Sequence, residues 1–96
     1  MIDFDLMVKN EEMGDVIVFL VGREDEGIAY PFIDRFFGRH KAAEKYGSYN
    51  IKLIEETRLL ENDGLIYSAK TYGAGYKKGP NWKEPKFVTE KKYGIK

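Results

Sequence analysis

Apolar and polar positions change from a helical to a strand-like period between residues 42 and 72. Helix-forming residues run from Ala42 to Tyr46, and Gly47 then stands where a helix C-terminus favours a residue that tolerates positive φ. Ser48 or Asn50 can accept backbone N–H bonds at the start of a second helix. That helix has one face with spacings of one, three and three residues, formed by Leu53, Ile54, Thr57 and Leu60. The pattern predicts two helices joined by a tight turn.

Turn-forming residues end the second of these helices. Asn62, Asp63 and Gly64 favour turn and left-handed conformations. Residues 65–72 then alternate well enough to form a strand. The expected order along this part of the chain is helix, turn, helix and strand.

This order and its residues resemble the prokaryotic winged helix-turn-helix regulators, which include the multiple-antibiotic-resistance and phenolic-acid-response repressor types. The group's first segment, roughly LAE+LG, is matched by Ala43, Glu44, Tyr46 and Gly47. Its second segment, LE-DGLI, is matched by Leu60, Glu61, Asp63, Gly64, Leu65 and Ile66. Residues 86–93, KFVTEKKY, look like the second wing strand running into the group's LTEKG segment. The resemblance implies a winged helix whose recognition helix, about residues 49–61, enters the DNA major groove.

The charges on this recognition helix are unusual for DNA binding. Lys52 and Arg58 are its basic residues, against Glu55, Glu56 and Glu61. Carboxylates repel phosphate, so the helix is expected to read bases sparingly and the wing to supply most of the affinity. Winged helices that bind proteins instead of DNA share the same pattern.

The N-terminal third fits two alternatives. Asn10 followed by two acids can cap a helix over Glu11 to Gly22. The β-branched residues within Val16 to Val21, and the alternation in Ile2 to Met7, also fit a β-hairpin through residues 10–14. The expected fold class is therefore mainly α with a small β-hairpin, a winged helix-turn-helix of the α+β type. The alternative is an α+β fold with an N-terminal β-hairpin and a central helix.

The segment after this third favours the winged helix. Ile28 to Tyr30 can form a short strand, and Pro31 fits the first turn of a following helix. On that helix Ile33, Phe36 and Phe37 are expected to face the core.

Length and composition allow one domain with one core, since the chain has 96 residues and 43% hydrophobic content. We expect an N-terminal extension over residues 1–14, a helical core over 15–66 and a wing hairpin over 65–93. The absence of cysteine and the single histidine exclude disulfides and Cys/His zinc sites. The longest apolar run, residues 16–21, is too short for a membrane span or secretory signal, so a cytoplasmic protein is expected.

The zero net charge conceals an asymmetry along the chain. Residues 70–96 carry eight lysines against Glu84 and Glu90, a net charge of +6, which leaves −6 on the first 69 residues. Aromatic residues are interleaved with these lysines, and the stretch GAGYKKGPNWKEPK is typical of a mobile wing tip. Lysines beside aromatic rings can hold a phosphate backbone. The alternative is a solvated hairpin whose aromatic residues complete the core.

Two function classes follow. The first is a small, sequence-specific or semi-specific double-stranded DNA-binding protein, a transcriptional regulator expected to be a homodimer. Its predicted DNA-binding residues are Tyr49, Asn50, Lys52 and Glu55 on the recognition helix and Lys70, Tyr76, Lys77, Lys78, Trp82 and Lys83 in the wing. The second is a winged-helix interaction module, a viral or accessory inhibitor or adaptor that binds a protein partner and not DNA.

No residue set argues for catalysis, so an enzyme is not expected, and neither is a metal site or a cofactor. His40 lies between Arg39 and Lys41 and is expected on a helix surface without a chemical role.

Overall fold

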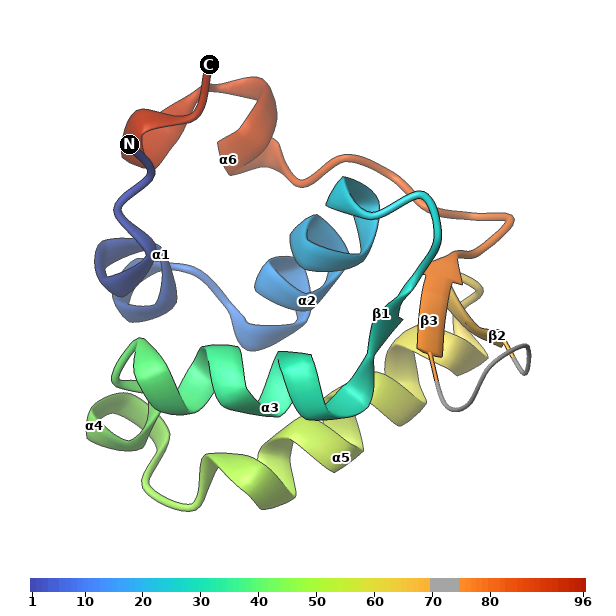
Figure 1. Ribbon diagram of the computed structural model, residues 1–96, viewed down its shortest axis with the longest axis horizontal. Helices are drawn as coiled ribbons and strands as arrows, with labels where there is room; N and C mark the ends of the chain where they lie inside the picture. Colours follow the sequence, from blue (N-terminus) through green and yellow to red (C-terminus); the bar gives the residue numbers. More distant parts are fainter. Residues whose placement is uncertain (70–74) are drawn as a thin grey trace.

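The computed structural model describes residues 1–69 and 75–96 (Figure 1). These residues form six α-helices, one short 3-10 helix and three strands. In chain order they are α1 (Phe4–Asn10), α2 (Met13–Arg23), β1 (Ile28–Ala29), α3 (Tyr30–Arg39), α4 (Ala42–Tyr46), α5 (Tyr49–Asn62), β2 (Ile66–Ala69), β3 (Gly75–Lys78), α6 (Lys86–Thr89) and the 3-10 helix η1 (Lys92–Gly94).

The strands form one antiparallel sheet in the order β1-β3-β2. Ile28 lies opposite Tyr76 in the first pair of strands, and Tyr67 lies opposite Lys77 in the second. The protein is thus mainly helical with a small sheet, which confirms the expected class at this level. The alternative with an N-terminal β-hairpin is wrong, because the first two elements are both helices.

The first helix, α1, begins at a side-chain N-cap, although residues 2–7 alternate between apolar and polar as in a strand. The Asp3 side chain accepts a hydrogen bond from the Leu6 backbone N–H at 3.0 Å, as an N-cap does. Met7 and Val8 are buried in the core. At the other end of α1, the Lys45 ammonium donates to the carbonyl oxygens of Val8 at 3.1 Å and Glu11 at 2.7 Å. The segment predicted as an N-terminal extension, residues 1–14, thus contributes Met7, Val8 and Met13 to the core.

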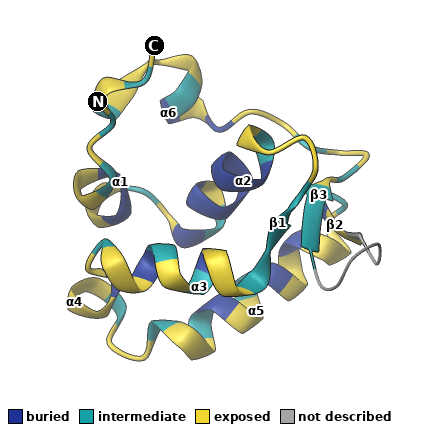
Figure 2. Cartoon of the chain, viewed as in Figure 1, coloured by how far each residue is buried: buried dark blue, intermediate teal, exposed yellow. Residues whose placement is uncertain are grey.

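Helix α2 runs through the middle of the protein and is buried over residues 16–21 (Figure 2). A helix that is apolar all round is stable when other elements cover every side, and this outweighs the strand preference of its valines and isoleucine. The helix predicted for residues 11–22 is confirmed, with a shifted start. Glu12 is the N-cap residue, while Asn10, the predicted cap, is the last residue of α1.

Side chains from the other elements close around α2. Ile33 and Phe37 of α3 are buried as predicted, and Phe36 is half-buried with its ring edge-on to Phe37 at 5.5 Å. The predicted strand at Ile28 and the helix beginning around Pro31 are both present. The Nδ1 of His40 lies 2.8 Å from the Asp5 carboxylate and so links the end of α3 to α1.

The C-terminal segment differs from the prediction. Residues 86–93, expected to be the second wing strand, form α6 and η1 instead, and the strand that pairs with β2 is β3. Pro85 presets the φ angle at the N-cap of α6, and the buried Phe87 packs its ring against Phe19 at 5.5 Å. The paired strands of the hairpin are therefore β2 and β3, and β3 ends at Lys78, well before the predicted end at residue 93. Part of the stretch predicted as a mobile tip, residues 75–78, is β3 itself.

The two termini meet through Tyr93, whose hydroxyl donates to the Glu11 carboxylate and whose carbonyl accepts from the Asp3 N–H at 2.8 Å. Burial, together with the hydrogen bond and charge of Glu11, raises the pKa of Tyr93 from 10.0 to about 12.

This raised pKa predicts a loss of stability at alkaline pH. The unfolded chain releases the Tyr93 proton first, so the stabilisation is fully present below pH 10 and is lost as the pH rises through about 12. The free energy of unfolding, measured by urea denaturation, is expected to differ between wild type and Tyr93→Phe at pH 9, with a smaller difference near pH 12. A difference that stays constant over this range would contradict the prediction.

Candidate nucleic-acid interface

The turn between α4 and α5 forms as the sequence predicts. Gly47 follows α4 with a φ of 66°, and its N–H donates to the Ala43 carbonyl at 2.9 Å. Ser48 is the N-cap residue of α5 by position, although its side chain makes no capping bond. The short turn holds the start of α5 beside α4, so that α5 crosses beneath α2 and α3 (Figure 1).

One side of α5 is anchored in the core. Leu53, Thr57 and Leu60 are buried. The Thr57 hydroxyl lies 3.0 Å from both the Leu53 and the Ile54 carbonyl oxygens, to which it can donate its hydrogen bond. Ile54 was expected on this face but is 51% exposed. The anchored face is therefore narrower than predicted, and more of the helix is left open to solvent.

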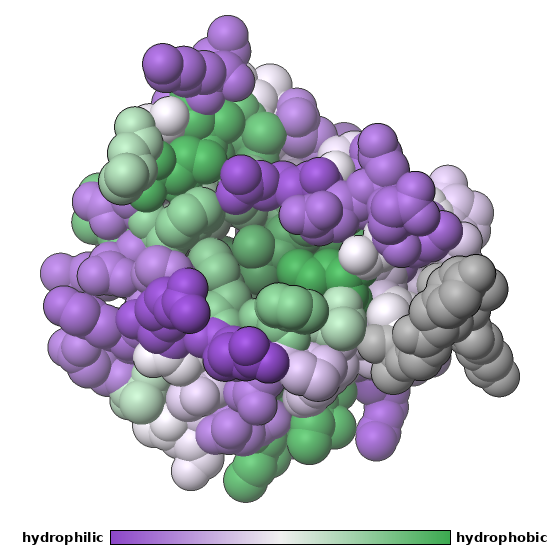
Figure 3. Space-filling view, in the orientation of Figure 1, coloured by the Kyte–Doolittle hydropathy of each residue, from purple (hydrophilic) through white to green (hydrophobic). Residues whose placement is uncertain are grey.

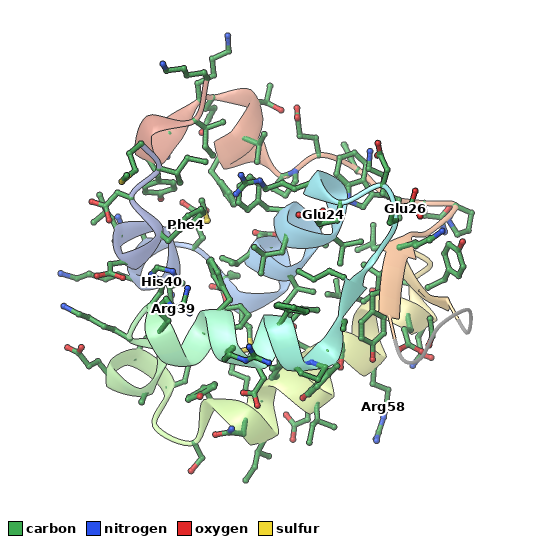
Figure 4. All side chains as sticks on the ribbon, in the orientation of Figure 1. Phe4, Glu24, Glu26, Arg39, His40 and Arg58 are labelled. Carbon is green, nitrogen blue, oxygen red and sulfur yellow. The ribbon has the colours of Figure 1, made fainter. Side chains whose placement is uncertain are left out.

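The opposite side of α5 faces solvent and is largely aliphatic. Its exposed residues recur at helical spacing: Ile51, Ile54, Glu55, Arg58 and Leu59. The three aliphatic side chains are 63%, 51% and 55% exposed. Figure 4 shows Arg58 extending away from the body of the protein. We call these five residues the outer face of α5.

Three of the four residues of α5 that were predicted to contact bases make contacts within the protein. Tyr49 is half-buried against Gly38, where a Cβ would lie 2.7 Å from its hydroxyl. The Asn50 amide donates to Asp34 of α3 at 3.3 Å, and the Lys52 ammonium lies 3.3 Å from Glu56. Of the four predicted helix residues, Glu55 is the one on the outer face.

The hairpin is held rigidly to the end of α5. Gly64 adopts a φ of 76° after the helix, and the Asn81 side chain donates to the Asp63 carbonyl at 3.0 Å. The backbone of Gly79 comes so close to Gly64 that a Cβ there would overlap the Gly64 carbonyl. The N–H of Gly79 also donates to the Leu65 carbonyl at 3.0 Å. These contacts fix β2 and β3 beside the C-terminal end of α5.

This hairpin and the turn after it are basic. Residues 66–83 contain four lysines and no acidic residue. Lys70 lies outside the described residues. Lys77 is half-buried beside Gly27, Lys78 places its ammonium 4.6 Å from the Trp82 ring, and Lys83 is exposed. Within residues 1–69 and 75–96, no ion pair joins Lys77, Lys78 or Lys83 to a carboxylate.

The two aromatic residues predicted to contact DNA, Tyr76 and Trp82, are half-buried against the core. The Trp82 indole N–H donates to the Val18 carbonyl of α2 at 3.1 Å, and the ring fills the space left by Gly22. Tyr76 is half-buried, and burial together with the charge and hydrogen bond of Glu61 raises the pKa of its hydroxyl. The Trp82 ring also lies against the Lys78 ammonium, so part of the surface of both half-buried rings is already covered.

A second feature of the surface is a hollow between α2, β1 and α3. It has a volume of about 260 Å³ and is lined by Leu20, Ile28, Phe32, Arg35, Phe36, Arg39 and His40. Figure 3 shows hydrophobic atoms at the centre of the face toward the viewer and again at the lower edge, where α5 lies in Figure 1. None of the residues that line the hollow belongs to α5, so the hollow is separate from the outer face of that helix.

Comparison of the chain with protein-family models, curated proteins and solved structures finds no significant match. Within the described part of the chain, no group of three or more His, Cys, Asp or Glu side chains is arranged to hold a metal ion. No helix in that part is long and apolar enough to span a bilayer.

Proposed function

We propose that this protein is a winged helix-turn-helix domain that binds double-stranded DNA and regulates transcription. Its order of elements, helix α2, strand β1, helices α3 to α5 and hairpin β2–β3, supports this proposal, and so does the sheet order β1-β3-β2. The observation that carries it is the position of α5, with one face in the core and the other exposed beside a hairpin free of acidic residues. A helix of this kind fits the major groove, which is about 12 Å wide.

In the proposed complex the outer face of α5 enters the groove and the hairpin contacts the backbone beside it. Arg58, on that face, contacts a phosphate or a guanine edge. Lys70, Lys77, Lys78 and Lys83 contact phosphates and supply most of the affinity. A homodimer would place two copies of α5 on successive half-sites of the DNA. The homodimer itself remains a prediction from the sequence resemblance.

The dependence of affinity on salt tests this function. Binding to a fluorescein-labelled random duplex, followed by anisotropy, is expected to weaken steeply between about 50 and 200 mM salt. In Lys77→Glu/Lys78→Glu, the slope of log affinity against log salt is expected to fall by about 2. The control, Lys86→Glu/Lys96→Glu, makes the same charge change at two exposed lysines of the C-terminal segment, far from α5 in Figure 1. Binding that does not depend on salt, or an equal effect of both variants, would contradict the proposal.

The exposed aliphatic residues of α5 favour a second candidate, a module that binds a protein. Ile51, Ile54 and Leu59 together make an apolar surface of the kind that protein partners cover. This function predicts no shift of duplex DNA in a gel and capture of a protein partner that is insensitive to salt. Loss of that capture in Ile51→Ala/Ile54→Ala would support it.

A further inference from the structure

The outer face of α5, which is proposed to contact the bases, carries exposed aliphatic side chains. Ile51 and Ile54 are three residues apart and are 63% and 51% exposed. Side chains three apart in a helix lie on the same face. Exposing them to water is unfavourable, and burial against an apolar group of a ligand recovers this free energy.

Two of the polar side chains near them, Asn50 and Lys52, already make contacts within the protein. Asn50 donates to Asp34, and Lys52 pairs with Glu56 while its ammonium lies 5.4 Å from the Tyr46 ring. Reading a base edge with either side chain requires breaking these contacts first. The first two turns of α5 therefore offer a ligand the methyl and methylene groups of the two isoleucines, beside the exposed carboxylate of Glu55.

The major groove of DNA carries one apolar group, the 5-methyl of thymine, which aliphatic side chains contact. We propose that Ile51 and Ile54 recognise thymine methyl groups, so that the protein prefers A·T-rich duplex DNA. This inference rests on the proposed DNA-binding function. The adjacent basic hairpin and Arg58 argue for DNA as the occupant of this face, since their charge complements the phosphates that flank the groove.

Replacing thymine with uracil tests the inference, because the two bases differ only by that methyl group. Two A·T-rich duplexes of the same sequence are compared by anisotropy, one with thymidine and one with deoxyuridine at every thymine position. Each lost methyl contact is expected to weaken binding roughly fourfold. Wild type is therefore expected to bind the uracil duplex about 16-fold more weakly when both isoleucines contribute.

Variants assign the effect to this face. Ile51→Ala/Ile54→Ala is expected to bind the two duplexes equally. The matched control is Phe32→Ala, which removes an apolar side chain of similar exposure, 60%, from α3 and is expected to keep the preference for thymine. Circular dichroism establishes that each variant is folded.

The possible outcomes distinguish failure of thymine-methyl recognition from failure of DNA binding. Equal wild-type affinity for the two duplexes overturns methyl recognition and leaves DNA binding intact. Failure to bind either duplex overturns the proposed function itself. A dimer in sedimentation equilibrium that Ile51→Ala/Ile54→Ala converts to a monomer assigns this face to a second copy of the chain and overturns the inference.

Discussion

Arg58→Glu is expected to weaken binding to duplex DNA by about 100-fold near 0.1 M salt. The variant replaces a positive charge with a negative one in the middle of the outer face of α5, where the side chain extends away from the protein (Figure 4). A contact of Arg with a phosphate or guanine is lost, and the new carboxylate repels the backbone. Fluorescence anisotropy with a random duplex measures the change.

Arg39→Glu is the matched control, since Arg39 is also an exposed arginine near the end of a helix but lies beside His40 and Phe4 on a different side of the protein. It is expected to change affinity only slightly. If the two variants weakened binding equally, the effect would reflect net charge, and α5 would have no special part in binding.

Trp82→Ala is expected to lower the free energy of unfolding by about 3 kcal/mol, at the lower end of the range for Trp-to-Ala changes because the ring is half-buried. The variant loses the hydrogen bond to the Val18 carbonyl and the packing of the ring over Gly22. Trp82→Phe keeps part of the packing and is expected to cost about 1 kcal/mol for the lost hydrogen bond. Both changes are measured by urea denaturation followed by circular dichroism. Tryptophan fluorescence cannot report unfolding in these variants, because Trp82 is the one tryptophan of the chain.

The same variant separates the two interpretations of Trp82. A structural role predicts reduced stability, with near-normal DNA affinity in the fraction that remains folded. Unchanged stability with lost DNA binding would instead place Trp82 among the residues that stack on DNA, as the sequence alone suggested.

The segments predicted correctly are those whose signals are local. The boundary between α4 and α5 depends on Gly47, which can adopt positive φ, and the end of α5 depends on the turn residues from Asn62 to Gly64. The start of α3 similarly follows from Pro31. Each signal acts within one turn of the chain, so the sequence reveals it directly.

The errors lie where distant contacts decide the structure. In the N-terminal segment, Lys45, far along the chain, binds carbonyl oxygens at the end of the helix. The Asp3 cap of this helix is, by contrast, a local signal that was present in the sequence. The segment after Pro85 is helical because Phe87 packs against α2 and Tyr93 meets Glu11. Neither the period-two pattern in residues 2–7 nor the resemblance of residues 86–93 to a wing strand shows these partners.

The sequence indicates which segments form the candidate site, but not which side chains of α5 are engaged by other residues. The concentration of lysines in the hairpin is visible from composition. On α5, the partner that holds Asn50 is Asp34 of another helix, which the sequence does not reveal. The pairing of Lys52 with Glu56 has the i, i+4 spacing of helical ion pairs, and that signal was available.

The central claim is that α5 and the β2–β3 hairpin form a surface that binds DNA, and mapping amide chemical shifts by NMR tests it most directly. Titration of the labelled protein with a random duplex is expected to shift the amides of α5 and of residues 66–83, while those of α1 and α6 stay in place. An unchanged spectrum, or shifts confined to α1, α6 or the hollow beside α3, would contradict the claim.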